Sequence, residues 1–179
     1  MDELSRISCV ADAMYDLGQN GYSVHQMTDF DRVPEIAKRL GKTYLTPQLD
    51  PMLNDFTPAN CFWLVVEHDK KPIAMGGVRF DDLGGEDVSA FWQRTFARHY
   101  EGGIFDIAAP ISSAVNGRIA YLGDLFIDPS ARGSRNYLKA AFQICHLLIS
   151  LKWDPDSTYA FLRESDVARG ASWLYGFTW

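Results

Sequence analysis

The chain has 179 residues, a length that favours one domain with a sizeable core. Hydrophobic residues make up 47% of it and charged residues 22%, the proportions of an ordinary globular protein. A net charge of −6 argues against a protein whose main task is to coat nucleic acid or a membrane surface, and it is compatible with a cationic substrate such as an amine.

The first half of the chain is predicted to contain helices and a β-hairpin. Apolar residues recur with helical period over residues 3–18 and alternate as in a strand over 22–27. A helix capped by Thr28 or Asp29 is expected through Arg32 to Leu40, ended by Gly41, and a second short helix is expected within 46–56. Two strands over 61–67 and 72–80, joined by residues 68–71, form the predicted hairpin.

The second half is predicted to open with an insertion, residues 81–118, that holds a helix over 86–100. The dipeptide Asn116-Gly117 is a strong hairpin signal and predicts that 111–115 pairs with 118–127. A long helix over 134–152, a strand over 158–163 and a last helix, capped by Ser165 and ending near Gly176, follow. This mixed order predicts an α/β fold: a single domain of residues 1–179 with helices on both faces of a central twisted sheet.

Residues 121–133 carry the clearest functional signal. An apolar strand runs into Asp128-Pro129, and Arg132-Gly133 then leads into the long helix. A helix N-terminus presents free N–H groups and the positive end of the helix dipole, which suits a phosphate. This order resembles the acyl-CoA-binding core of the GNAT N-acetyltransferase superfamily. Further pieces resemble it in the same order, namely 22–40, 63–67 with 73–78, and the C-terminal Gly176-Phe177.

The resemblance implies that acetyl-CoA, or another acyl-CoA, is the co-substrate. In this superfamily the fourth strand splays away from the fifth, and the pantetheine arm pairs with the opened edge. By resemblance, the pantetheine would contact the backbone of Leu125, Phe126 and Ile127. The pyrophosphate would lie on the amides of Arg132, Gly133, Ser134, Arg135 and Asn136.

The loop departs from the superfamily pattern, which expects glycine at 135 and glycine or alanine at 137. The chain has Arg135 and Tyr137 there. A Cβ obstructs the close approach of backbone to phosphate, whereas an arginine can bind phosphate as a forked donor. Tyr137 either packs away from the loop as a helix residue or obstructs it. The phosphate cradle is therefore either rebuilt, or CoA binding is weakened or lost.

The catalytic positions depart as well. The superfamily's glutamate on the fourth strand corresponds to Gly123, and the neighbouring acid Asp124 is the best candidate for handling the proton, although successive strand residues face opposite ways. The superfamily's general-acid tyrosine corresponds to Ser172. Tyr175 follows three residues later on the same helix face, so Tyr175 and Ser172 are both candidates for assisting departure of the CoA thiolate.

The expected function is that of a cytoplasmic N-acetyltransferase, which moves an acetyl or related acyl group to an amine of a small molecule or a protein. One alternative is a catalytically inactive GNAT-like binding or assembly module. Another is the same fold with a larger acyl donor, held by Phe and Trp residues of the insertion. A third is an unrelated α/β interaction domain, in which the fourth and fifth strands would not splay.

Cofactors and partners are constrained by what the sequence lacks. Cys9, Cys61 and Cys145 lie far apart among apolar neighbours, which predicts buried free thiols and no disulfide or zinc site. No histidine has metal-ligand spacing, so no metal is expected and His146 is predicted to pack in the core. Neither a signal peptide nor a bilayer-spanning apolar run is apparent, and no nucleic-acid or membrane partner is expected. The aromatic C-terminus predicts a homodimer through Trp173, Tyr175, Phe177 and Trp179.

Overall fold

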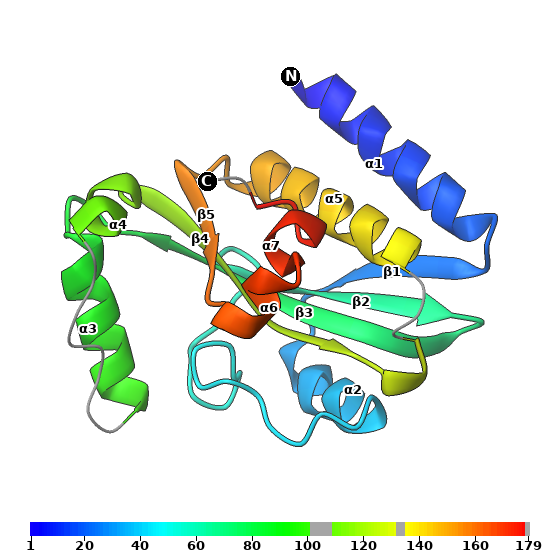
Figure 1. Cartoon of the computed structure of the whole chain (residues 1–179), viewed down its shortest axis with the longest axis horizontal. Helices are drawn as coiled ribbons and strands as arrows, with labels where there is room; N and C mark the ends of the chain where they lie inside the picture. The colour runs from blue at the N-terminus through cyan, green and yellow to red at the C-terminus, as the bar shows by residue number, and fades with distance from the viewer. Residues whose placement is uncertain (101–108, 132–134, 178–179) are drawn as a thin grey trace.

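A five-stranded sheet organises the part of the molecule that the structure describes. The computed structural model describes residues 1–100, 109–131 and 135–177. The sheet has the order β1-β2-β3-β4-β5, and its strands are Tyr22–Met27, Cys61–His68, Lys71–Asp82, Arg118–Ile127 and Ser157–Ala160. The first four strands are antiparallel, whereas β5 is parallel to β4. Helices lie on both sides of the sheet, which confirms the predicted α/β fold (Figure 1).

Helices α1 (Glu3–Gly18) and α5 (Arg135–Lys152) cover one face of the sheet and contact each other. Alternate residues of a strand point to the same face, and on β2 these are Phe62, Leu64 and Val66. They pack with apolar residues of α5 such as Ile144 and Ile149, both nearly inaccessible. Burying each such side chain stabilises the fold by about 1.5–3 kcal/mol relative to exposure. This α5 face therefore holds the largest core.

The opposite face is covered by α2 (Val33–Arg39), which follows a 3-10 turn η1 (Phe30–Arg32), and by the chain from 41 to 60. The short helix predicted within 46–56 is wrong, because this stretch forms turns. The side chain of Asn54 donates to the carbonyl oxygens of Pro47 and Asp50, and Asp50 accepts from the backbone N–H of Met52. Such local bonds offer the backbone an alternative to a helix.

The insertion contributes α3 (Val88–His99), as predicted, and α4 (Ala109–Ala114). The predicted pairing of 111–115 with β4 is wrong, because that stretch belongs to a helix and β4 pairs with β3 and β5 instead. The side chain of Asn116 donates to the carbonyl oxygen of Ser113, and Gly117, with φ of 68°, turns the chain into β4. The Asn-Gly pair thus makes a turn from a helix to a strand.

The C-terminal region is attached to α5. β5 is shorter than predicted, and the last helix is broken into α6 (Glu164–Ala168) and α7 (Ala171–Leu174) at Gly170, whose φ is 84°. Arg163, not Ser165, is the N-cap residue of α6. The Nε2 atom of His146 lies 2.8 Å from the carbonyl oxygen of Tyr175, so this histidine does pack within the fold. Of the aromatic residues predicted to form a dimer surface, Trp173 is exposed, Tyr175 and Phe177 are half-buried, and Trp179 lies outside the described residues.

All three cysteines are free; Cys61 and Cys145 are buried, whereas Cys9 is only half-buried. Within residues 1–100, 109–131 and 135–177, no helix is long and apolar enough to cross a membrane. The same residues contain no cluster of three or more His, Cys, Asp or Glu side chains that could hold a metal ion.

Candidate functional site

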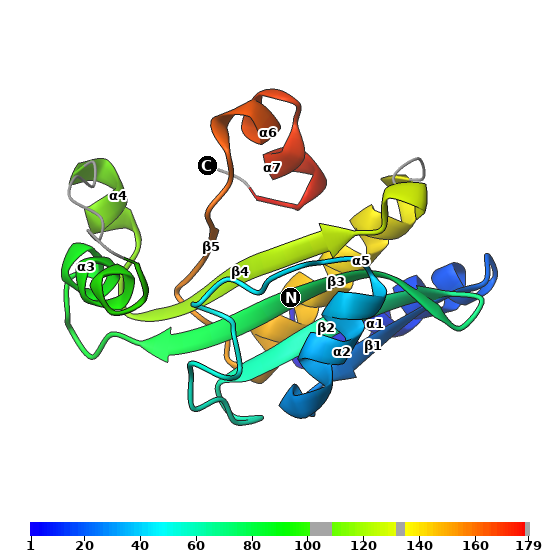
Figure 2. The same ribbon diagram turned by 90° about the horizontal axis from the view of Figure 1, so that it is seen from below.

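The strands β4 and β5 separate halfway along β4. They pair only from Ile119 opposite Ser157 to Leu122 opposite Ala160. Beyond Leu122, β4 continues to Ile127 with β3 as its partner, while the chain after β5 turns away toward α6 (Figure 2). Within the part of the chain that the structure describes, no strand pairs with the outer edge of β4 from Gly123 to Phe126. The splay that the superfamily resemblance implies is therefore present.

A β-bulge lies at the point of separation. Gly123 is opposite Gly77 and Phe126 is opposite Met75, so Asp124 and Leu125 together oppose one residue of β3. Asp124 has φ of 55°, in the left-handed region, which an aspartate tolerates better than most residues. The extra residue changes the alternation, and Asp124 faces the α2 side, as Gly123 does. The expectation that these neighbours face opposite ways is wrong because of the bulge.

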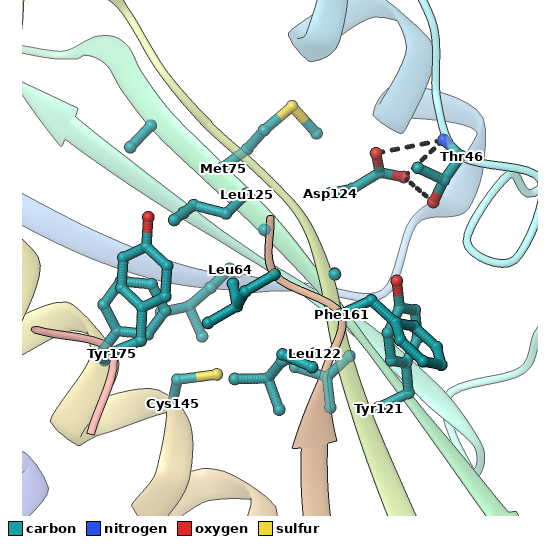
Figure 3. A pocket seen from close by; sticks show the side chains of 18 of the residues that line it. Thr46, Leu64, Met75, Tyr121, Leu122, Asp124, Leu125, Cys145, Phe161 and Tyr175 are labelled. Carbon is teal, nitrogen blue, oxygen red and sulfur yellow. Dashed lines mark hydrogen bonds between the residues drawn. The ribbon is translucent and has the colours of Figure 1, made fainter. Parts of the chain in front are cut away.

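Asp124 is a buried carboxylate with a full set of partners. The Nζ atom of Lys42 lies 2.8 Å from Oδ1, and the side chains of Asp124 and Lys42 are 0% and 10% exposed. The backbone N–H and the hydroxyl of Thr46 both donate to Oδ2 at 2.9 Å (Figure 3). The Lys42 ammonium also lies 5.8 Å from the centre of the Phe126 ring. This ion pair attaches the segment after α2 to the strained bulge of β4.

A tyrosine occupies the space beside Gly123. A Cβ on Gly123 would lie 2.5 Å from the hydroxyl oxygen of Tyr121, so no larger residue fits there without moving the ring. Burial, and after it the negative charge of Asp124, raises the pKa of Tyr121 far above its usual value. Beside Gly123, which corresponds to the superfamily's glutamate, the side chain present is thus the phenol of Tyr121, and this phenol stays protonated. The sequence analysis did not identify Tyr121 as a site residue. A glycine two residues after a tyrosine in a strand could have indicated it, because the missing side chain leaves room for the tyrosine ring.

A cavity of about 580 Å³ passes through the sheet where the strands separate. Its lining on the α2 side is partly polar and includes Lys42, Gln48, Tyr121 and Asp124. Its lining on the α5 side is apolar and includes Leu64, Leu122 and Cys145. The insertion also contributes, through Phe96 and Tyr100. Two molecules could therefore meet at the splay from opposite faces of the sheet.

Among the predicted catalytic residues, Asp124 and Tyr175 both line this cavity, whereas Ser172 does not. Burial raises the pKa of Tyr175, so its phenol also remains protonated near neutral pH. Figure 3 shows Tyr175 and Tyr121 at opposite ends of the cavity.

The structure describes some of the predicted cofactor-binding residues and not others. Leu125 lines the cavity; Phe126 packs in the core under α2 and Ile127 in the core under α5. Arg135 is the first residue of α5 and Asn136 is exposed in its first turn, while Arg132, Gly133 and Ser134 lie outside the described residues.

Tyr137 packs into the core, which confirms the first of the two expectations for it. The residue is 2% exposed, its ring stacks on Tyr22 at 5.0 Å, and its hydroxyl donates to the carbonyl oxygen of Ala131 at 3.0 Å. Ala131 ends the 3-10 turn η2 (Pro129–Ala131), which comes directly before the predicted phosphate loop. The hydroxyl of Tyr137 thus ties the start of α5 to that turn.

No family model and no curated protein matches the chain. Several solved structures do match the chain. A predicted acetyltransferase with acetyl-CoA from Clostridium acetobutylicum is 13% identical, with a TM-score of 0.50 over 88% of this chain and 90% of that one. An aminoglycoside acetyltransferase from an uncultured soil metagenomic sample, in complex with sisomicin, is 11% identical, with a TM-score of 0.50 over 88% of each chain. At these identities the likeness shows the fold, which is that of the GNAT acetyltransferases.

Proposed function

We propose that this chain, which has the fold of the GNAT acetyltransferases, is a CoA-dependent acyltransferase that passes an acetyl or related acyl group to an amine. The observation that carries this proposal is the cavity through the sheet at the splay of β4 and β5. A thioester held at the opened edge of β4 could be reached by an acceptor from the α2 face. Positioning of this kind can supply much of the rate enhancement of a direct transfer.

The residues present fit an acyl-CoA at this place. The unpaired outer edge of β4 at Leu125 offers backbone groups to the amides of pantetheine. The first turn of α5, with Arg135 and Asn136, offers free N–H groups and the positive end of an 18-residue helix to the pyrophosphate. In the reaction the amine nitrogen bonds to the thioester carbon, the carbon–sulfur bond breaks, the amine loses a proton and the CoA thiolate gains one.

The protonated phenol of Tyr175 is the proposed donor to the departing thiolate. Asp124 is the proposed proton acceptor, and the three donors around its carboxylate favour a second role, in which it anchors Lys42. The variant Asp124→Asn separates the two roles. Loss of a base lowers kcat of the folded enzyme, whereas loss of an anchor lowers the free energy of unfolding and leaves kcat of the folded enzyme unchanged.

A small-molecule amine is the proposed acceptor. The net charge of −6 favours a cationic acceptor, and one structure of similar fold is an aminoglycoside acetyltransferase in complex with sisomicin. An inactive binding module is the second candidate, since glycine stands at 123 and serine at 172 where the superfamily pattern has its catalytic side chains.

The proposal is tested by calorimetric titration with acetyl-CoA and with free CoA, followed by a thiol-release assay with sisomicin, spermidine and a lysine peptide. Binding in the micromolar range with turnover of an amine is expected. Binding without turnover would favour the inactive module, and no binding at millimolar ligand would overturn the proposal. The double variant Arg132→Ala/Arg135→Ala should lose CoA affinity, whereas Arg39→Ala, on the exposed side of α2, should not.

A further inference from the structure

The cavity has an arm that extends beyond the edge of β4. On the α5 face, Leu64 and Val66 of β2 and Val78 of β3 line the same cavity as Leu122 of β4. In the sheet order, β2 is separated from β4 by β3. Adjacent strands lie about 4.8 Å apart, so the arm runs about 10 Å under the sheet from the edge where pantetheine would pair.

The arm is apolar along its length. Its walls are Leu64, Val66, Val78 and Leu122 from the sheet, with Leu138 and Cys145 from α5. Each of these side chains is between 1% and 8% exposed. Figure 3 shows Leu64, Leu122 and Cys145 between Tyr175 and Tyr121. An apolar space of this kind favours an apolar group and disfavours a polar one that finds no hydrogen-bonding partner.

Gly76 leaves this space open. It lies between Ala74 and Val78 on β3, and a Cβ added there would meet nothing closer than 3.8 Å. Gly76 is not among the glycines with positive φ, so neither backbone conformation nor close packing requires a glycine at this position. The absent side chain enlarges the arm next to Leu125, at the bulge where the thioester would lie.

We propose that the acyl donor carries an unbranched chain longer than acetyl, and that this chain lies in the arm under β3. This inference rests on the proposed acyltransferase function. A saturated chain advances about 1.3 Å per methylene, so an arm of about 10 Å takes acyl groups of about four to eight carbons. The walls of the arm come from β2, β3, β4 and α5. Of the Phe and Trp residues of the insertion, which the sequence had led us to expect around a larger donor, Phe96 lines the same cavity.

Titration calorimetry on the full chain with acetyl-CoA, hexanoyl-CoA and sodium hexanoate tests this inference. Each buried methylene should tighten binding about fourfold, so hexanoyl-CoA should bind at least tenfold and up to about 200-fold more tightly than acetyl-CoA. In Gly76→Val, the added methyl groups should occupy the arm. The affinity for hexanoyl-CoA should then fall to that for acetyl-CoA in the same variant, so the ratio of the two affinities should drop to about one. The control Ala97→Val, on an exposed site of α3, should change neither affinity.

The outcomes separate the inference from the function on which it rests. Equal affinities for acetyl-CoA and hexanoyl-CoA would overturn the inference and leave the acyltransferase proposal standing. Free hexanoate that binds as tightly as hexanoyl-CoA would identify a fatty-acid site and also overturn it. Absence of binding by every CoA species would overturn both. If circular dichroism shows that Gly76→Val does not fold, Val66→Phe blocks the far end of the arm and carries the same expectation.

Discussion

Removal of the Asp124 carboxylate should strongly destabilise this protein, because it would leave the Lys42 ammonium charged and nearly buried. The ammonium is 2.8 Å from the carboxylate, and its side chain is 10% exposed. Breaking a buried ion pair by removing one partner costs about 3–5 kcal/mol. The N–H and hydroxyl of Thr46 lose their acceptor at the same time. We expect Asp124→Ala to lower the free energy of unfolding by about 4 kcal/mol.

Urea unfolding followed by the fluorescence of the five tryptophans measures this loss. The transition midpoint should fall without a change in slope. For a chain of this size, a loss of about 4 kcal/mol should lower Tm by about 8–16 °C. The matched control is Glu35→Ala, which breaks the exposed ion pair with Arg39 (2.7 Å) and should cost less than about 1 kcal/mol.

Two companion variants separate the charge from the backbone. Asp124 has φ of 55°, where alanine is strained by about 1–2 kcal/mol, so Asp124→Gly removes the carboxylate without that strain. Adding Lys42→Met to either variant should recover part of the loss, since the unpaired charge is then gone. If Asp124→Gly cost no more than Glu35→Ala, the reasoning that the pair holds the bulge would be refuted.

Three further predictions concern the site and its surroundings. Gly123→Glu introduces the superfamily's glutamate and should lower the free energy of unfolding in urea by about 1–3 kcal/mol, because the new side chain collides with the Tyr121 ring. Adding Tyr121→Ala should remove that collision and its cost. A single variant as stable as the original protein would contradict the close contact between position 123 and Tyr121. Tyr175→Phe should lower kcat at least about tenfold in the thiol-release assay with KM for acyl-CoA unchanged, and an unaltered kcat would exclude Tyr175 as the proton donor. Burial raises the pKa of the Cys61 and Cys145 thiols from 9.0 to about 12. The free energy of unfolding should therefore be unaffected by these thiols below pH 9 and should fall as the pH rises toward 12, because the thiols then ionise more readily in the unfolded chain. Replacing both cysteines with alanine should flatten that decline, and a decline of unchanged steepness would assign it to other groups.

Local patterns were sufficient where one face of an element is buried. The helix over residues 3–18 and the strand over 22–27 have the predicted bounds, because their apolar residues repeat with the period of the element. Local patterns failed where side chains bond to the backbone. Asn54 holds a turn where a helix was expected, and Asn116 ends a helix where a hairpin was expected.

The sequence predicted which segments contribute to the site, but it did not predict how their side chains are arranged. Asp124 and Tyr175 do line the cavity, as their places near the strand end and the last helix suggested. Lys42 and Tyr121 escaped notice. Nothing near Lys42 in the chain shows that it pairs with a residue on a distant strand, and the role of Tyr121 depends on the missing side chain at Gly123.

By itself the sequence determined the elements and the region of the site, because helix and strand periodicity and the turn before α5 depend on residues a few positions apart. The tertiary structure alone decided which way Asp124 faces, what neutralises it and how far the cavity reaches under the sheet. One extra residue in a strand reverses the side-chain alternation, and it can be recognised only when the partner strand is known. A cavity is likewise shaped by walls from strands and helices far apart in the chain, so its extent appears only when they pack together.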